Sequence, residues 1–259
     1  MSSSNLKIPF FSFIEELGGY FVFFGDTVRW MFRPPFDAAN IITQMLEIGY
    51  KSIPVTTITI FFTGMVMAYQ IGGAMDSLMS GSSIFIGSAV TISMFRELCP
   101  VLTALLLAGR VGSSMAAEIG TMKVTEQIDA LRTLSADPVQ YLAVPRFLSC
   151  LVMTPALTVI TDMVGVLGGA FIAYFSLGIT LEKYIDNILQ YLSLADFFSG
   201  LAKSVFFGIE IAVISCYQGF STRGGAEGVG KSTIQAVVKS SMVILISDYF
   251  LTYLITFIE

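Results

Sequence analysis

The sequence predicts an all-α integral membrane protein with five transmembrane helices, an N-terminal interfacial helix and a cytoplasmic helix between two spans. Hydrophobic residues make up 54% of the 259 residues and charged residues only 13%, whereas soluble domains carry about 25% charged residues. The mean hydropathy is +0.78, and the apolar runs approach or exceed the roughly 20 residues that cross a bilayer. The net charge of −5 argues against a nucleic-acid-binding protein, which would present a basic face.

Residues 1–50 form an aromatic, amphipathic segment that precedes the predicted transmembrane domain, residues 51–259. Phenylalanines and Trp30 are set among acidic and basic residues, and no charge-free stretch is long enough to span hydrocarbon. This pattern favours a helix lying in the membrane interface, with its rings at the acyl boundary and its charges among the headgroups. A helix packed against the soluble side of the protein is the alternative. Pro34-Pro35 then predicts a corner, because proline interrupts a helix.

The first two spans are predicted over residues 53–75 and 84–109. The second contains Arg96, Glu97 and Pro100 near its middle. Proline lacks an N–H and clashes with the preceding turn, so we expect the second helix to be broken near Pro100. Such a break is tolerated at membrane depth only beside protein or a watery cavity. The second span is therefore predicted to line a cavity.

Residues 110–146 are predicted to form a cytoplasmic loop that contains an amphipathic helix from about 114 to 134. This stretch combines good helix formers with charged residues, and its polar face would be available to dock a partner. The charged residues are Glu118, Lys123, Glu126, Asp129 and Arg132.

Three further spans are predicted over residues 147–177, 197–217 and 236–258. The third span exceeds a minimal crossing, so we expect it to tilt, to kink at Pro155 or to project beyond the bilayer. A polar connector precedes the fourth span, and a Gly-rich loop, residues 218–235, precedes the fifth.

Lysine and arginine residues determine the predicted orientation. Eleven of them fall on the side of the N-terminus, and only Lys183 falls on the other. This predicts a cytoplasmic N-terminus, cytoplasmic loops at 110–146 and 218–235, and Glu259 on the opposite side. The spans show no internal repeat, and an odd number of them cannot build a two-fold pathway alone. We therefore expect a homodimer. The eleven residues are Lys7, Arg29, Arg33, Lys51, Arg110, Lys123, Arg132, Arg146, Arg223, Lys231 and Lys239.

The segment from Gly225 to Ser232 reads GAEGVGKS and matches the P-loop pattern GxxxxGK[ST]. A working P-loop needs a buried strand before it and a helix after it, but a membrane span precedes this segment. We interpret the match as fortuitous and expect a flexible cytoplasmic turn. The chain has no histidine, and its three cysteines lie in apolar runs without CxxC spacing. No catalytic residue, metal site or disulfide is predicted.

Six ionisable residues fall within the predicted spans. Each costs about 2.5–3.5 kcal/mol at the centre of a helix, so such groups pair with one another or line aqueous cavities. One interpretation is structural pairing, for example Glu97 with Lys203 or Arg96 with Asp248, and the sequence does not choose between pairings. The other is that Arg96 and Lys203 hold an anionic headgroup. Asp162 and Glu210 are expected closer to the interfaces. The six are Arg96, Glu97, Asp162, Lys203, Glu210 and Asp248.

The run from Arg96 to Phe147, RELCPVLTALLLAGRVGSSMAAEIGTMKVTEQIDALRTLSADPVQYLAVPRF, closely resembles the signature of the MlaE family. This family comprises permease subunits of ABC-type, MCE-associated lipid transporters. The later GGAEGVGKSTIQAVV and the last span with Asp248 are similar to the same family. The resemblance covers residues from about 40 to 259 and includes the five-span topology. In the first forty residues only the amphipathic character agrees.

The resemblance implies a homodimer in the bacterial inner membrane that moves phospholipid or a related lipid, with a role in outer-membrane lipid asymmetry. Its implied partners are a cytoplasmic ABC ATPase dimer, an MCE-domain lipid-binding protein and often a STAS-domain protein. ATP and Mg²⁺ would bind to the ATPase, and this chain would need no cofactor. The C-terminus would be periplasmic. An ATP-independent secondary carrier and a membrane scaffold are the alternatives.

The resemblance also implies roles for two groups of residues. Arg96, Glu97, Lys203 and Asp248 match polar residues of the family's central lipid cavity. Glu118, Lys123, Glu126 and Asp129 match the element that rests on the ATPase.

Overall fold

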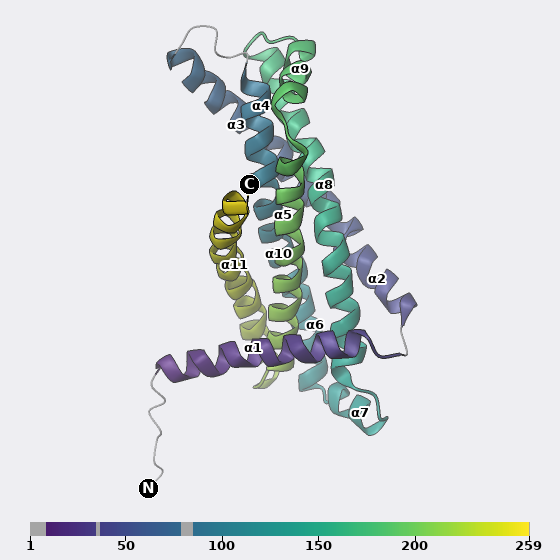
Figure 1. Cartoon of the computed structure of the whole chain (residues 1–259). Coiled ribbons are helices and arrows are strands. Elements are labelled where there is room, and N and C mark those ends of the chain that lie inside the picture. Colours follow the sequence, from purple (N-terminus) through teal and green to yellow (C-terminus); the bar gives the residue numbers. More distant parts are fainter. Residues whose placement is uncertain (1–8, 35–36, 79–84, 259) are drawn as a thin grey trace.

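The computed structural model of the chain describes residues 9–34, 37–78 and 85–258, and every regular element in these ranges is a helix (Figure 1). Five helical segments in the described part are long and apolar enough to cross a membrane, as predicted from the sequence. They cover Ala38–Met75, Ile86–Val124, Val139–Phe175, Leu194–Phe220 and Gly225–Phe257.

Helix α1, Pro9–Met31, runs across one end of the spans instead of along them (Figure 1). It packs Phe23 and Phe24 against the bundle and buries Thr27, while Phe21 and Val22 remain exposed. A helix that buries one apolar face in protein and exposes another at the ends of the spans is placed as an interfacial helix would be.

The first span begins earlier than its predicted start at residue 53. Helix α2, Ala38–Ile48, a 3-10 turn, Tyr50–Ser52, and α3, Ile53–Leu78, form one apolar segment. Asp37 starts this segment by accepting a hydrogen bond from the Asn40 N–H at 3.1 Å, which satisfies an N-terminal donor that has no partner within the helix. Part of the predicted interfacial segment therefore belongs to the first span.

The second span is one helical segment with two π-turns. It consists of α4 (Ile86–Ser93), a π-turn (Met94–Leu98), α5 (Cys99–Leu107), a second π-turn (Ala108–Gly112) and α6 (Ser113–Val124). The expected break near Pro100 takes the form of the first π-turn, directly before the proline.

Helical structure continues past residue 110, the predicted start of the cytoplasmic loop, to Val124. The position of this segment outside the membrane stays a prediction. The second π-turn keeps the backbone helical through this glycine-containing stretch. Gly112 also packs closely on α10, where a Cβ atom would lie 2.8 Å from Ser215 Oγ.

The remaining elements complete the bundle. Helix α7 follows Glu126, whose φ of 60° turns the chain between α6 and α7. Pro155 lies inside α8, which stays helical throughout. The bounds are α7 Gln127–Thr133, a π-turn Val139–Ala143, α8 Val144–Phe175, α9 Leu181–Tyr191, α10 Leu194–Phe220 and α11 Gly225–Ile258.

The segment GAEGVGKS is the start of helix α11, so the prediction of a flexible turn was wrong. Only residues 221–224 separate α10 from α11. Gly224 and Gly225 have φ values of +94° and +69° and turn the chain, after which the helix begins at once. A Cβ atom at Gly228 would lie 1.9 Å from the Arg223 carbonyl oxygen, so glycine allows this tight entry. Helix α10, and not a strand, precedes this segment, so the strand–loop–helix arrangement of a P-loop is not formed here.

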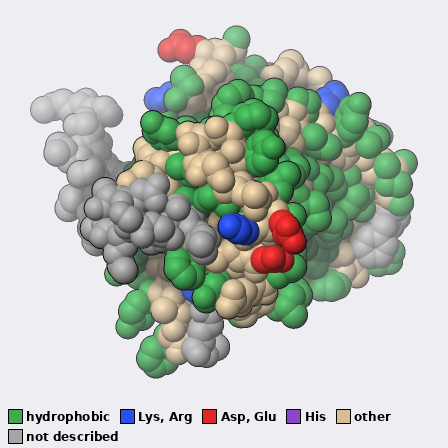
Figure 2. All heavy atoms as spheres, turned by 90° about the horizontal axis from the view of Figure 1, so that it is seen from above, with side chains coloured by type: hydrophobic (Ala, Val, Ile, Leu, Met, Phe, Trp, Pro, Cys, Tyr) green, Lys and Arg blue, Asp and Glu red, His purple; other side chains and the backbone are tan. Residues whose placement is uncertain are grey.

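Helices α3 and α8 approach closely through glycines. A Cβ atom at Gly64 would lie 2.2 Å from the Gly165 carbonyl oxygen, and one at Gly168 would lie 2.2 Å from the Phe61 carbonyl oxygen. Small residues permit such backbone contact between membrane helices. In contrast, α11 is largely exposed along its length. Figure 2, which looks along the spans from the end opposite α1, shows hydrophobic side chains over most of the visible surface.

Candidate functional site

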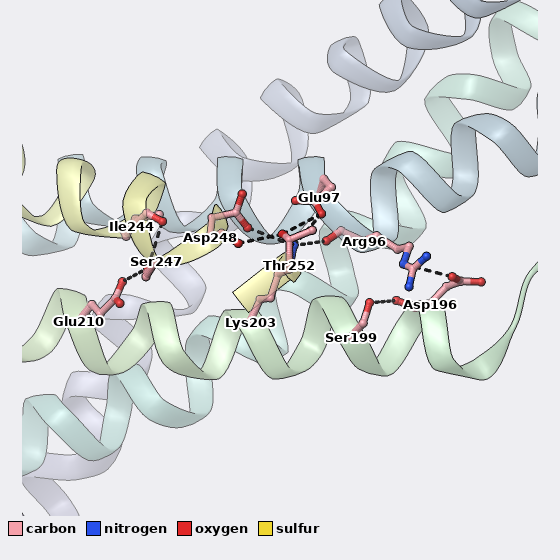
Figure 3. A network of polar contacts seen from close by, with 10 residues as sticks. All are labelled: Arg96, Glu97, Asp196, Ser199, Lys203, Glu210, Ile244, Ser247, Asp248 and Thr252. Atoms are coloured by element: carbon pink, nitrogen blue, oxygen red, sulfur yellow. Dashed lines mark hydrogen bonds and ion pairs between the residues drawn. The ribbon is translucent and has the colours of Figure 1, made fainter. Parts of the chain in front are cut away.

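A group of charged residues lies where the first π-turn meets α10 and α11 (Figure 3). Lys203 of α10 is 2% exposed. Its Nζ lies 2.8 Å from Glu97 Oε1 and 3.1 Å from Asp248 Oδ1. The contact with Asp248 is an ion pair without hydrogen-bond geometry. Lys203 thus links the second, fourth and fifth spans through two carboxylates.

The remaining donors of Lys203 are also used. Its ammonium donates to the Arg96 carbonyl oxygen at 3.0 Å and to Thr252 Oγ1 at 2.7 Å. The Arg96 carbonyl stands four positions before Pro100, which has no N–H to donate in the usual helical pattern. Lys203 therefore supplies the hydrogen-bond donor that the proline lacks. This explains why a buried lysine lies beside the π-turn and Pro100.

The Arg96 side chain extends away from Lys203 and toward the N-terminal end of α10 (Figure 3). Its Nε lies 3.4 Å from Asp196 Oδ1. Asp196 also accepts a hydrogen bond from the Ser193 N–H at 2.9 Å as part of the capping box that begins α10. Of the two pairings left open by the sequence, Glu97 with Lys203 is present, and Arg96 contacts Asp196 instead of Asp248.

Among the described residues, the site contains two cations, Arg96 and Lys203, and three carboxylates, Glu97, Asp196 and Asp248. The charge of Lys203 is balanced by its two carboxylate neighbours. The Arg96 side chain is 31% exposed and Lys203 only 2%. Arg96 is therefore the more accessible cation, although the sequence analysis predicted the same headgroup-binding role for both residues.

Asp162 and Glu210 lie inside the bundle, and their expected position close to the membrane interfaces stays a prediction. Asp162 belongs to α8, Val144–Phe175, and is 2% exposed. Its Oδ1 has no hydrogen-bond partner among the described residues. Glu210 of α10 accepts a hydrogen bond from Ser247 at 3.0 Å. Together with Lys203 and Asp248, this bond forms a polar seam between α10 and α11.

Three residues of the site were missed from the sequence: Asp196, Ser247 and Thr252. The spacing of Ser193 and Asp196 is that of a capping box, which could have placed Asp196 at a helix start. Thr252 follows Asp248 by four residues and so lies on the same helix face, a periodicity that was available from the sequence. Ser247 is adjacent to Asp248 and points about 100° away from it around the helix.

The residues predicted to contact an ATPase lie at the end of the bundle where α1 crosses (Figure 1). Glu118 of α6 forms an ion pair with Arg146, with Oε2 and NH2 2.8 Å apart. Lys123 Nζ lies 3.7 Å from Asp129 Oδ1, and Glu126 is exposed between α6 and α7. Because α6 continues the second span, Glu118 and Lys123 connect along one helical segment to Arg96 and Glu97.

Comparison with known proteins gives consistent results. The model of the family described as Permease MlaE matches residues 41–254. A probable ABC transporter permease protein of Rickettsia typhi is 43% identical over 94% of this chain and 93% of its own length. One from Synechocystis sp. is 41% identical over 98% of this chain and 96% of its own length. One from Pyropia yezoensis is 37% identical over 92% of each.

Proposed function

The chain belongs to the MlaE family of ABC transporter permeases, and from this premise we propose that it moves phospholipid or a related lipid. In this proposal a separate cytoplasmic ATPase drives transport, and an extracytoplasmic MCE-domain protein exchanges lipid with the permease, often with a STAS-domain protein attached. The observation that carries the proposal is the charged group at the first π-turn, enclosed by apolar spans and joined through one helical segment to α6.

The accessible cation defines where a lipid headgroup would bind. Arg96 is partly exposed, while Lys203 is surrounded by Glu97 and Asp248. We assign Arg96 the contact with a phosphate group, and Lys203, Glu97 and Asp248 the role of holding the second, fourth and fifth spans in place around it. Apolar side chains on the spans would accompany the acyl chains.

A second copy of the chain would complete the transport route. Helix α11 exposes an apolar face that includes Tyr249, Phe250, Tyr253 and Phe257. The same helix carries Asp248 of the charged group. Pairing two copies along α11 would place two such groups near a common axis, as a homodimer requires. The proposal places the chain in the bacterial inner membrane with its N-terminus in the cytoplasm and its C-terminus in the periplasm.

Coupling to ATP hydrolysis would use α6 and α7. In this proposal Glu118, Lys123, Glu126 and Asp129 face the ATPase, and its closure displaces α6. The ion pair between Glu118 and Arg146 would pass part of that displacement to α8. The continuous helical segment would pass the rest to the π-turn beside Lys203.

Lipid transfer by the intact transporter tests the proposal. The tagged chain is purified from its native membrane in gentle detergent, and its protein partners and lipids are identified by mass spectrometry. Transfer of fluorescent phospholipid to the MCE-domain partner is then measured with and without ATP. We expect Arg96→Ala to lower ATP-dependent transfer about tenfold or more, because a charge-assisted contact is lost.

Lys183→Ala is the matched control, since Lys183 is an exposed cation of α9 at the opposite end of the bundle. We expect it to transfer lipid as the wild type does. Unchanged transfer by Arg96→Ala in an intact complex would refute the headgroup assignment. Lipid movement by the isolated chain in liposomes without ATP would favour a secondary carrier instead.

A further inference from the structure

A polar cavity lies apart from the charged group of the spans, at the end of the bundle where α1 crosses. Its volume is about 700 Å³, which is within the range of small-molecule sites. Residues of α1, α6, the end of α10, the turn after it and α11 line it. Three parts of the chain that are distant in the sequence therefore meet around one space.

The lining of this cavity is predominantly cationic. Lys123, Arg223 and Lys239 contribute positive charge, and Glu16 is the one acidic residue among the lining residues. Glu16 accepts hydrogen bonds from Lys239 and from Gln218, so this carboxylate and Lys239 neutralise each other. Two cations remain for a ligand.

Neither remaining cation is firmly held by protein carboxylates. Lys123 Nζ lies 3.7 Å from Asp129 Oδ1, a long contact to a carboxylate that is 52% exposed. Arg223 is exposed and forms no ion pair with any residue in the described part of the chain. Hydroxyl and amide groups of Thr222, Ser232 and Gln235 add hydrogen-bonding capacity at the wall. This combination suits an oxyanion that takes several hydrogen bonds and a charge at once.

The position of the cavity indicates which oxyanion it would meet. Glu16 belongs to α1, which lies across the ends of the spans with Phe21 and Val22 exposed (Figure 1). A helix of this kind lies at the boundary between headgroups and acyl chains. The cavity therefore opens at the depth of phospholipid headgroups.

We propose that this cavity binds a phosphate group, with Arg223 and Lys123 as its principal ligands and Ser232 as a hydrogen-bond partner. The phosphate belongs either to the headgroup of an anionic phospholipid in the adjacent leaflet or to free inorganic phosphate. The binding residues differ from those of the charged group in the spans, and Lys123 alone is shared with the surface proposed to face the ATPase. Arg223 has no role in the transport proposal, so variants at Arg223 separate failure of this proposal from failure of the transport proposal.

Binding to the full chain in a neutral detergent tests the site. Short-chain dihexanoyl phosphatidylglycerol, the zwitterionic dihexanoyl phosphatidylcholine and inorganic phosphate are titrated separately by calorimetry. Phosphatidylglycerol is then titrated again in the presence of phosphate. We expect saturable binding of phosphatidylglycerol that weakens as ionic strength rises. Tighter binding of the lipid than of phosphate supports the headgroup source, and equal binding with full competition supports free phosphate.

Variants at Arg223 decide whether the cavity is responsible. Arg223→Ala should weaken binding about tenfold, because one charge-assisted contact is lost. Arg223→Gln, which keeps a polar side chain, provides the same test if the alanine variant does not fold. Arg223→Lys keeps the charge and should retain most of the affinity.

Lys231→Ala is the matched control, since Lys231 is an exposed cation of the same helix start that does not line the cavity. It should bind as the wild type does. The proposal is overturned if the wild type shows no saturable binding of either anion, or if Arg223→Ala binds as tightly as Lys231→Ala. Equal affinity for phosphatidylcholine and phosphatidylglycerol would also overturn it.

Discussion

Lys203 compensates for Pro100: its ammonium donates at 3.0 Å to the Arg96 carbonyl oxygen, the acceptor that a residue with an N–H at position 100 would use. Pro100 and Lys203 belong to different spans. A hydrogen bond that the proline cannot form within its own helix is therefore replaced by one from a side chain of another helix. The same ammonium lies between Glu97 and Asp248. The Lys203 Nζ atom therefore both stabilises the distorted part of the second span and joins α10 to that span and to α11.

Replacing Lys203 should destabilise the protein strongly. Lys203→Met keeps the apolar length but leaves two carboxylates and a carbonyl without their cation. Removing one partner of a buried ion pair costs about 3–5 kcal/mol, and we expect about 3 kcal/mol because Glu97 is 40% exposed. Thermal unfolding in detergent should show a lower Tm. Adding Glu97→Gln and Asp248→Asn to this variant should restore much of the loss, and a triple variant no more stable than Lys203→Met would contradict the assignment.

Contact between α3 and α8 should be sensitive to a single methyl group. Gly64→Ala would place a Cβ atom 2.2 Å from the Gly165 carbonyl oxygen, and backbone cannot move aside without separating the helices. We expect destabilisation of about 1–3 kcal/mol from overpacking, measured as a lower Tm. Gly73→Ala in the same helix is the control, because nothing lies within 4 Å of its added Cβ. That change should be neutral or slightly stabilising, and equal effects of the two substitutions would refute the close contact.

Attachment of α1 should weaken in acid. Burial raises the pKa of Glu16, but hydrogen bonds from Lys239 and Gln218 outweigh it, so the pKa lies below its ordinary value of 4.5. A carboxylate with a lowered folded-state pKa stabilises the protein above the unfolded pKa, and this stability is lost as pH falls through the folded pKa. The wild type should therefore have a higher Tm than Glu16→Gln at pH 7, and the difference should shrink below about pH 4.5. A constant difference down to pH 3 would show that the charge of Glu16 plays no part.

Fluorescence of Trp30 should report the depth of α1. Trp30 is the only tryptophan of the chain and lies in the last turn of α1, with the Arg33 guanidinium 5.2 Å from its ring centroid. Tryptophan rings favour the headgroup level of a membrane. In nanodiscs, lipids brominated near the headgroup should quench Trp30 more than lipids brominated near the chain ends. Trp30→Phe provides the background signal. Absence of quenching, or stronger quenching by the deep bromines, would place α1 elsewhere.

The five spans and the distortion near Pro100 were predictable because hydropathy and proline chemistry are local properties. The extent of the helices was not. The second span was predicted to end at residue 109, but a π-turn keeps residues Ala108–Gly112 helical. Glycine in a helix costs only about 1 kcal/mol, and Gly228 and Gly230 are likewise accommodated within α11.

Pairing of charged residues depended on tertiary geometry. Glu97 with Lys203 was one of two pairings open to the sequence, whereas Arg96 found Asp196 because α10 begins beside the first π-turn. The burial of Asp162 inside the bundle was not predictable, because it depends on which helices pack against α8.

The two π-turns of the second span have a further mechanical consequence. Each contains one residue more than an α-helical turn. The backbone of a helix can accommodate this extra residue at different positions along its length. If it migrates along the segment, only the residues it passes change register, each turning by about 100° and advancing by about 1.5 Å. Residues beyond it keep their places. Migration of a π-turn along the span between Ile86 and Val124 would thus change which side chain faces the centre of the bundle, while both ends of the span stay in place.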